Sequence, residues 1–136
     1  MDELKDLHII IAEDDPDDGE IILASFSKHE SFAKVNVVSN GKELLDNLKD
    51  ASAEKPDVIL TDINMPILSG IEVLEAICED SELSQIPAFV YSTSINPIYE
   101  VQCMKLGTKG FIIKPFRLKD FDNIPTKIIE ILKKTR

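Results

Sequence analysis

The segment Val58-Ile-Leu-Thr-Asp-Ile-Asn-Met-Pro-Ile-Leu-Ser-Gly70 decides how the rest of the chain is interpreted. Its first four residues favour an extended, buried strand and lead directly into the carboxylate of Asp62. Pro66 and Gly70 then indicate a turn, because proline fixes φ and glycine adopts conformations that other residues resist. Taken alone, an aspartate in this place more often caps a loop or a helix. The pattern nevertheless predicts a carboxylate at the C-terminal edge of a parallel sheet, where α/β proteins bind ligands.

Composition limits the classes of protein to consider. The chain has 136 residues, 43% of them apolar, which suits one globular domain with a proper core. Its formal net charge of −10, without any run of Lys and Arg, disfavours nucleic acid as a partner. The apolar stretches are only strand-sized and the N-terminus is acidic, so we expect no membrane span, no signal peptide and a cytoplasmic location.

The cysteines and histidines suggest no chemistry of their own. Cys78 and Cys103 form no C-x-x-C motif and have no histidine at metal-binding spacing. We therefore expect two buried free thiols in a reducing compartment. His8 and His29 fall at a strand start and a helix end, where neither needs a catalytic role.

Apolar strand-like segments alternate with helical patterns along the whole chain. The predicted strands are residues 8–12, 35–38, 58–61, 87–91 and 110–113. Asp15 and Pro16 mark the start of a helix that reaches about His29, and Asn96-Pro97 marks a later one. Pro125 places the start of the last helix near Asn123. This alternation predicts an α/β fold with one doubly wound parallel sheet and helices on both faces.

Polar residues follow four of the predicted strands and should meet at one edge of the sheet. They are Glu13 with Asp14, Asp62, Ser92 and Lys114. Three carboxylates at one point repel each other unless a cation lies among them, and oxygen ligands favour Mg²⁺ or Mn²⁺. With the ammonium of Lys114 and the hydroxyl of Ser92, such a site could hold a phosphoryl group. Asp62 is the natural nucleophile, exposed at its strand end, and would form an acyl phosphate.

Each of these residues also has an ordinary structural explanation. Lys114 could be a solvated loop lysine, and Ser92 could satisfy a backbone group at the strand end. Glu13 and Asp14 could be solvated charges at the entrance to a helix. The functional interpretation is favoured because all of them fall at successive strand ends on the same side of the sheet.

The same residues resemble a known family over essentially the whole chain. The acidic pair, the Asp-x-x-Met-Pro-x-x-x-Gly motif, the serine and the Lys-Pro-Phe motif are similar to those of receiver domains in bacterial two-component response regulators, stand-alone and chemotaxis-regulator-like. The matching residues are Glu13, Asp14, Asp62, Met65, Pro66, Gly70, Ser92, Lys114, Pro115 and Phe116. The resemblance implies a flavodoxin-like five-stranded sheet in the order 2-1-3-4-5.

The resemblance also assigns roles to individual residues. It implies that Asp62 accepts the phosphoryl group and that Asp14 and Asp62 ligate Mg²⁺ with the backbone carbonyl of Asn64. Glu13 would contribute to the metal site directly or through water. Lys114 would pair with the phosphoryl oxygens.

Further roles concern switching and hydrolysis. Ser92 would move toward the phosphoryl group and draw Phe111 inward, so that the fourth helix, fifth strand and fifth helix report the change. Phe111 has no hydroxyl where tyrosine is also found, and Ser92 lacks the methyl of the commoner threonine. Asn64 and Ser94 lie where receivers tune hydrolysis of the acyl phosphate.

The first functional hypothesis is a single receiver domain over residues 1–136 without an output domain. It would take a phosphoryl group from a sensor histidine kinase or a histidine phosphotransfer protein and signal or relay by protein contact. It would catalyse only its own phosphorylation and dephosphorylation. The sequence leaves open the kinase, the downstream target, and whether phosphorylation drives homodimerisation.

Two alternatives remain. The first is a pseudo-receiver that binds partners without phosphorylation. The second is a flavin-binding protein, which has less support because the acidic loops would repel the phosphate of the flavin.

Overall fold

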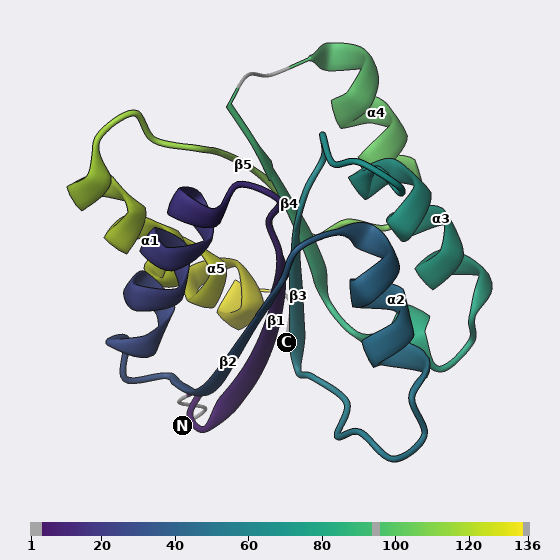
Figure 1. The fold of residues 1–136 in the computed structure, drawn as a ribbon, viewed down its shortest axis with the longest axis horizontal. Coiled ribbons are helices and arrows are strands. Elements are labelled where there is room, and N and C mark those ends of the chain that lie inside the picture. The colour runs from purple at the N-terminus through teal and green to yellow at the C-terminus, as the bar shows by residue number, and fades with distance from the viewer. Residues whose placement is uncertain (1–3, 94–95, 135–136) are drawn as a thin grey trace.

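A parallel sheet forms the centre of the fold in this computed structural model, which describes residues 4–93 and 96–134. The five strands lie in the order β2-β1-β3-β4-β5, which confirms the predicted fold class and strand order (Figure 1). The strands are β1 (Leu7–Ala12), β2 (Phe32–Val38), β3 (Val58–Asp62), β4 (Ala88–Ser92) and β5 (Gly110–Ile113). The helices are α1 (Pro16–Ser27), α2 (Gly41–Lys49), α3 (Gly70–Glu79), α4 (Pro97–Lys105) and α5 (Asn123–Lys134), with short 3₁₀ helices η1 (Leu83–Gln85) and η2 (Leu118–Asp122).

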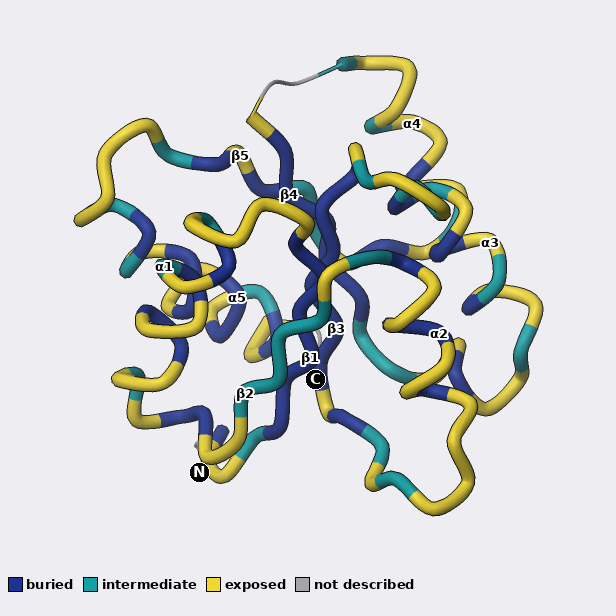
Figure 2. Tube along the Cα trace, viewed as in Figure 1, coloured by how far each residue is buried: buried dark blue, intermediate teal, exposed yellow. Residues whose placement is uncertain are grey.

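Helices cover both faces of the sheet because successive strand residues point to opposite sides. Ile9 and Ile11 of β1 pack in the core shared with α1 and α5, whereas Ile10 and Ala12 pack in the core shared with α2 and α3. Figure 1 shows α1 and α5 on one side of the sheet and α2, α3 and α4 on the other. Strands β1, β3 and β4 are the buried centre of the molecule (Figure 2).

The predicted helix starts are confirmed. The side chain of Asp15 caps α1 by accepting hydrogen bonds from two backbone N–H groups in its first turn, and Pro16 is the first helical residue. The side chain of Asn96 caps α4 by accepting a hydrogen bond from one backbone N–H, that of Ile98. Helix α5 begins at Asn123, after the turn formed by η2, so Pro125 lies in its first turn, where its missing N–H costs little.

Some boundaries and one burial prediction were wrong. Strand β2 begins at Phe32, three residues before the predicted start, and α1 ends at Ser27 rather than near His29. Cys78 is exposed on α3, although its apolar neighbours suggested burial. Cys103 is buried as predicted, and both cysteines are free thiols.

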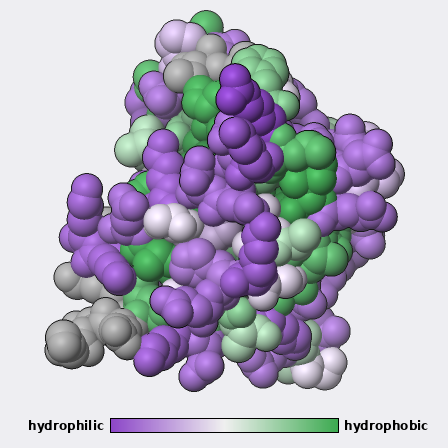
Figure 3. Space-filling model, turned by 90° about the vertical axis from the view of Figure 1, so that its left-hand side faces the viewer, coloured by the Kyte–Doolittle hydropathy of each residue, from purple (hydrophilic) through white to green (hydrophobic). Residues whose placement is uncertain are grey.

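The surface of one side of the molecule is visible in a space-filling view (Figure 3). The side of the molecule that carries α1 is mainly hydrophilic (Figure 3). Within residues 4–93 and 96–134, no helix combines the length and the apolar character needed to cross a bilayer.

Candidate functional site

The topology brings the predicted site residues to one edge of the sheet. Asp62 and Ser92 are the last residues of β3 and β4, and Lys114 follows β5 directly. Glu13 and Asp14 follow β1, just before the N-cap of α1. Because all strands are parallel, their carboxyl ends lie on the same side.

Three carboxylates meet at this edge. One oxygen each from Glu13, Asp14 and Asp62 lies within 4.8 Å of the others. Asp14 is exposed, whereas Glu13 and Asp62 are buried. The prediction that Asp62 is exposed at its strand end was therefore wrong: only 6% of the residue is accessible to solvent. All-oxygen donors at this spacing are the set that hard cations such as Mg²⁺ and Mn²⁺ prefer.

Lys114 lies buried among these acids. Its Nζ is 2.7 Å from Glu13 Oε1, 2.9 Å from Asp62 Oδ2 and 3.3 Å from Asp18 Oδ2. The ammonium also lies 4.8 Å from the centre of the Tyr91 ring, within the range of a cation–π contact. A solvated loop position for Lys114 is thereby excluded, because the side chain is only 6% exposed.

The electrostatics of the site follow from burial and from this ammonium. Burial raises the pKa of Asp62 above its usual range, and the hydrogen bond and charge of Lys114 only partly offset that rise. Burial lowers the pKa of Lys114, but the hydrogen bonds and charges of Glu13 and Asp62 together outweigh it and raise that pKa. Lys114 is therefore a fixed positive charge at neutral pH.

Both oxygens of the Asp62 carboxylate have partners. Oδ1 accepts a hydrogen bond from the backbone N–H of Asn64 at 3.1 Å, and Oδ2 accepts one from Lys114. The loop that follows returns closely over the strand end, since a Cβ on Gly70 would lie 2.4 Å from the backbone oxygen of Asp62. The glycine at this position is therefore a steric requirement of the loop beside Asp62.

Two further residues belong to the site and were not predicted. The hydroxyl of Tyr91 donates a hydrogen bond to Glu13 Oε1 at 2.5 Å, and burial, followed by the charge of Glu13, raises the pKa of Tyr91. Asp18 contacts Lys114, although its position in the first turn of α1 seemed to explain it. The sequence did contain a signal for Tyr91, which lies near the end of an apolar strand. A buried phenol needs a hydrogen-bond partner, so this tyrosine could have been expected to contact a polar residue of the site.

The remaining predicted residues lie around this cluster. Ser92 is buried, and its carbonyl accepts the backbone N–H of Lys114 at 2.7 Å. Phe111 is half-buried and packs against the core on the α2, α3 and α4 side. Asn64 is exposed. Ser94 lies outside the described residues.

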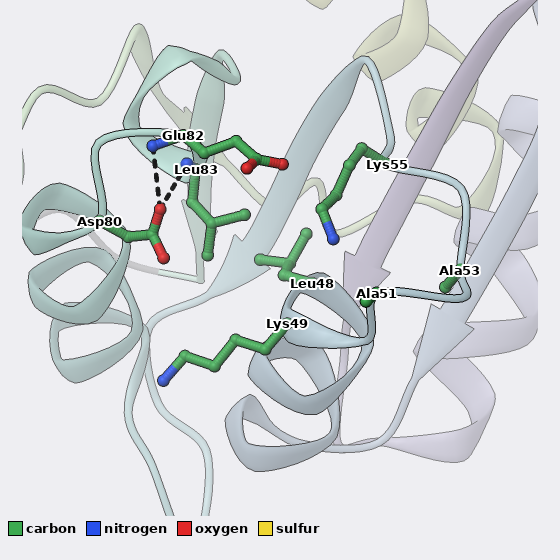
Figure 4. A pocket seen from close by; sticks show the side chains of 8 residues that line it. All are labelled: Leu48, Lys49, Ala51, Ala53, Lys55, Asp80, Glu82 and Leu83. Atoms are coloured by element: carbon green, nitrogen blue, oxygen red, sulfur yellow. Dashed lines mark hydrogen bonds between the residues drawn. The ribbon is translucent and has the colours of Figure 1, made fainter.

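A depression of about 410 Å³ lies at the opposite edge of the sheet (Figure 4). It is lined by Leu48, Lys49, Ala51, Ala53, Lys55, Asp80, Glu82 and Leu83. Asp80 there accepts hydrogen bonds from the backbone N–H groups of Glu82 and Leu83, so its carboxylate stabilises the turn before η1. None of the predicted site residues that the structure describes lines it.

The family whose description is "Response regulator receiver domain" matches residues 9–124. The chain belongs to this family. Receiver-domain proteins are signalling proteins of two-component systems, and the fold and motifs above are those of a receiver.

Curated relatives and solved structures agree. The receiver is 29% identical over 121 residues to the two-component response regulator ORR7 of Oryza sativa subsp. japonica, covering 89% of this chain and 56% of that protein. It is 28% identical to ORR11 of Oryza sativa subsp. indica, covering 88% of this chain and 80% of that protein. The receiver thus spans little more than half of ORR7 and most of ORR11.

Among solved structures, the phosphorylated cyanobacterial phytochrome response regulator RcpA superposes with a TM-score of 0.86 at 31% identity, over 96% of each chain. The Mn²⁺-bound form of the response regulator Rcp1 has a TM-score of 0.82 at 24% identity, over 90% of this chain and 91% of that one. At that identity the second likeness concerns the fold alone.

Proposed function

We propose that this receiver accepts a phosphoryl group on Asp62 from a phosphohistidine of a sensor kinase or phosphotransfer protein. The observation that supports this most is that the Asp62 carboxylate converges with the acidic pair and has the ammonium of Lys114 at 2.9 Å from its Oδ2. Phosphoryl transfer asks little of a protein beyond positioning and charge neutralisation, and these residues supply both.

Glu13, Asp14 and Asp62 fit a divalent cation, because their oxygens already converge within 4.8 Å. Asp14 and Asp62, with the carbonyl of Asn64, would hold Mg²⁺ or Mn²⁺. When bound, the ion supplies positive charge to the phosphoryl oxygens and the acids. The structural likeness to RcpA, a phosphorylated regulator, agrees with phosphorylation here.

Each residue of the site has a separate role in the proposed phosphoryl transfer. An oxygen of Asp62 forms the new bond to phosphorus as the phosphorus–nitrogen bond of the donor breaks, and the leaving imidazole takes a proton from solvent. Lys114 transfers its hydrogen bond from Asp62 to a phosphoryl oxygen. The Ser92 hydroxyl bonds the phosphoryl group and Phe111 follows it inward, which changes the surface of α4, β5 and α5. Asn64, exposed beside the site, tunes hydrolysis of the acyl phosphate together with Ser94.

Protein contact is the proposed output. Several exposed apolar side chains lie on α4, on β5 and in the segment between β5 and η2, and they include Ile98, Met104, Ile113 and Phe116. An exposed apolar surface of this kind suits a protein partner.

The test is incubation with Mg²⁺ and acetyl phosphate, followed by intact-mass measurement under rapid acid quench. We expect one added phosphoryl group in the wild type and none in Asp62→Asn. An unchanged wild-type mass, with partner binding indifferent to beryllofluoride, would support the pseudo-receiver instead. Modification that persists in Asp62→Asn would place the acceptor on another residue.

A further inference from the structure

Tyr91 touches both partners of the ion pair at the centre of the site. It is the residue before Ser92 at the end of β4, and its side chain is fully buried. Its hydroxyl donates to Glu13 Oε1 at 2.5 Å, while its ring faces the Lys114 ammonium at 4.8 Å. A single side chain therefore holds the carboxylate by one atom and the cation by its face.

The Glu13 carboxylate has three protein donors. Oε1 accepts from the Tyr91 hydroxyl and lies 2.7 Å from Lys114 Nζ, and Oε2 accepts from the backbone N–H of Asp15 at 3.1 Å. The Glu13 side chain is 0% exposed. A cation that took Glu13 Oε1 as a direct ligand would have to displace one of its two donors. Asp14, by contrast, is exposed to solvent.

We propose that Tyr91 is a positioning residue whose hydroxyl keeps Glu13 out of direct contact with the divalent cation. The ion is then held directly by Asp14 and Asp62, and Glu13 acts on it through water. Turning Glu13 toward the ion would leave the Tyr91 hydroxyl buried without a partner, which opposes direct ligation. The proposal rests on the proposed function, because it concerns the metal site of the same receiver.

The first test measures Mn²⁺ affinity from the electron paramagnetic resonance signal of the free ion. Tyr91→Phe keeps the ring and removes the hydroxyl, so that turning Glu13 toward the ion no longer leaves a buried phenol without a partner, while Lys114 and the Asp15 N–H still contact the carboxylate. We expect its dissociation constant to be about tenfold lower than that of the wild type. Tyr99→Phe is the matched control, because the chain has only two tyrosines and Tyr99 lies half-exposed on α4. It should bind Mn²⁺ as the wild type does.

The second test follows the Tyr91 phenol itself. The chain has no tryptophan, so the Tyr99→Phe protein has Tyr91 as its single strong near-ultraviolet absorber. Phenol absorption moves to longer wavelength when the hydroxyl donates a stronger hydrogen bond. We expect no spectral shift on saturation with Mg²⁺, because Glu13 stays on Tyr91. Adding Glu13→Gln to this protein should give a shift to shorter wavelength, which calibrates the probe.

The outcomes separate the two proposals. Mn²⁺ affinity of Tyr91→Phe that is unchanged or weaker, or a shift of the Tyr91 spectrum to shorter wavelength with Mg²⁺, overturns the role of Tyr91 alone. Failure of the wild type to bind Mn²⁺ at all overturns the metal-dependent function and this inference with it.

Discussion

Replacing Lys114 with methionine should destabilise this receiver far more than an ordinary loss of an ion pair. The ammonium lies within 3 Å of oxygens on Glu13 and Asp62, whose side chains are 0% and 9% exposed. Methionine keeps much of the aliphatic stem and removes the charge, which leaves two buried carboxylates facing each other. Breaking a buried pair by removing one partner costs about 3–5 kcal/mol. We expect the free energy of unfolding to fall by about 3 kcal/mol, near the lower end of this range. The reason is that Asp18, the third acid beside the ammonium, is partly solvated, so water already screens its charge.

The assay is urea unfolding followed by far-ultraviolet circular dichroism, in EDTA. Lys28→Met is the matched control, because Lys28 Nζ lies 2.8 Å from Asp122 Oδ2 but the two side chains are 64% and 42% exposed. An exposed pair contributes about 0–1 kcal/mol, so this control should unfold close to the wild type. The same chemical change at a similar distance thus isolates the effect of burial.

Magnesium adds an internal check on the Lys114→Met protein. A ligand at 100 times its dissociation constant stabilises the state that binds it by about 2.7 kcal/mol. Saturating Mg²⁺ should therefore restore most of the free energy of unfolding that Lys114→Met loses. Mg²⁺ should also stabilise Lys114→Met more than it stabilises the wild type, because the acids of the wild type already have the ammonium of Lys114 as a cation. If Lys114→Met costs no more than Lys28→Met in EDTA, the ammonium does not hold the acidic cluster together and the reasoning fails.

Two further predictions concern residues outside the cluster. Ile67 has φ +70°, a conformation that asparagine adopts more easily than isoleucine, and its side chain is 68% exposed. Ile67→Asn should therefore raise the free energy of unfolding, measured by urea titration, by about 1 kcal/mol. A lower free energy of unfolding would contradict the backbone strain. Burial, followed by Lys34, lowers the pKa of His8 below its ordinary 6.5, against the charges of Glu54 and Asp57. The unfolded chain then binds the proton more readily, so stability is greatest above pH 6.5 and falls as the pH drops toward the folded pKa. His8→Gln should flatten that part of the stability–pH curve, and an unchanged slope would refute the assignment.

Most of the fold was predictable because its signals are local. The continuous apolar segments, the Asp15-Pro16 and Asn96-Pro97 caps and the late start of α5 each reflect backbone chemistry within a few residues. The depth of a side chain is not local. Cys78 lies in apolar sequence but on the outer face of α3, and Asp62 ends its strand under a loop that returns at Gly70.

The site was predictable where a strand end exposed a functional group, and not where packing between elements decided the contact. Glu13, Asp14, Asp62, Ser92 and Lys114 follow from the parallel topology alone. Tyr91 and Asp18 do not, because each already had a complete local explanation, one as a core strand residue and one in a first helical turn. Only the position of the Lys114 ammonium, which depends on the ends of four strands and on α1, shows that they belong to the site.

The position of the Lys114 ammonium affects how a phosphoryl group could be transferred to Asp62 under the proposed function. Oδ1 of Asp62 accepts a hydrogen bond from the Asn64 N–H and Oδ2 accepts one from Lys114, so an incoming phosphoryl group competes with these donors for the carboxylate. Lys114 can leave Asp62 without leaving the site, because Glu13 holds it independently at 2.7 Å. The phosphoryl oxygens then replace one negatively charged acceptor of the ammonium with another, so no buried positive charge is stranded on the way. The second anchor at Glu13, itself fixed by Tyr91, is therefore what allows the lysine to change partners at low cost.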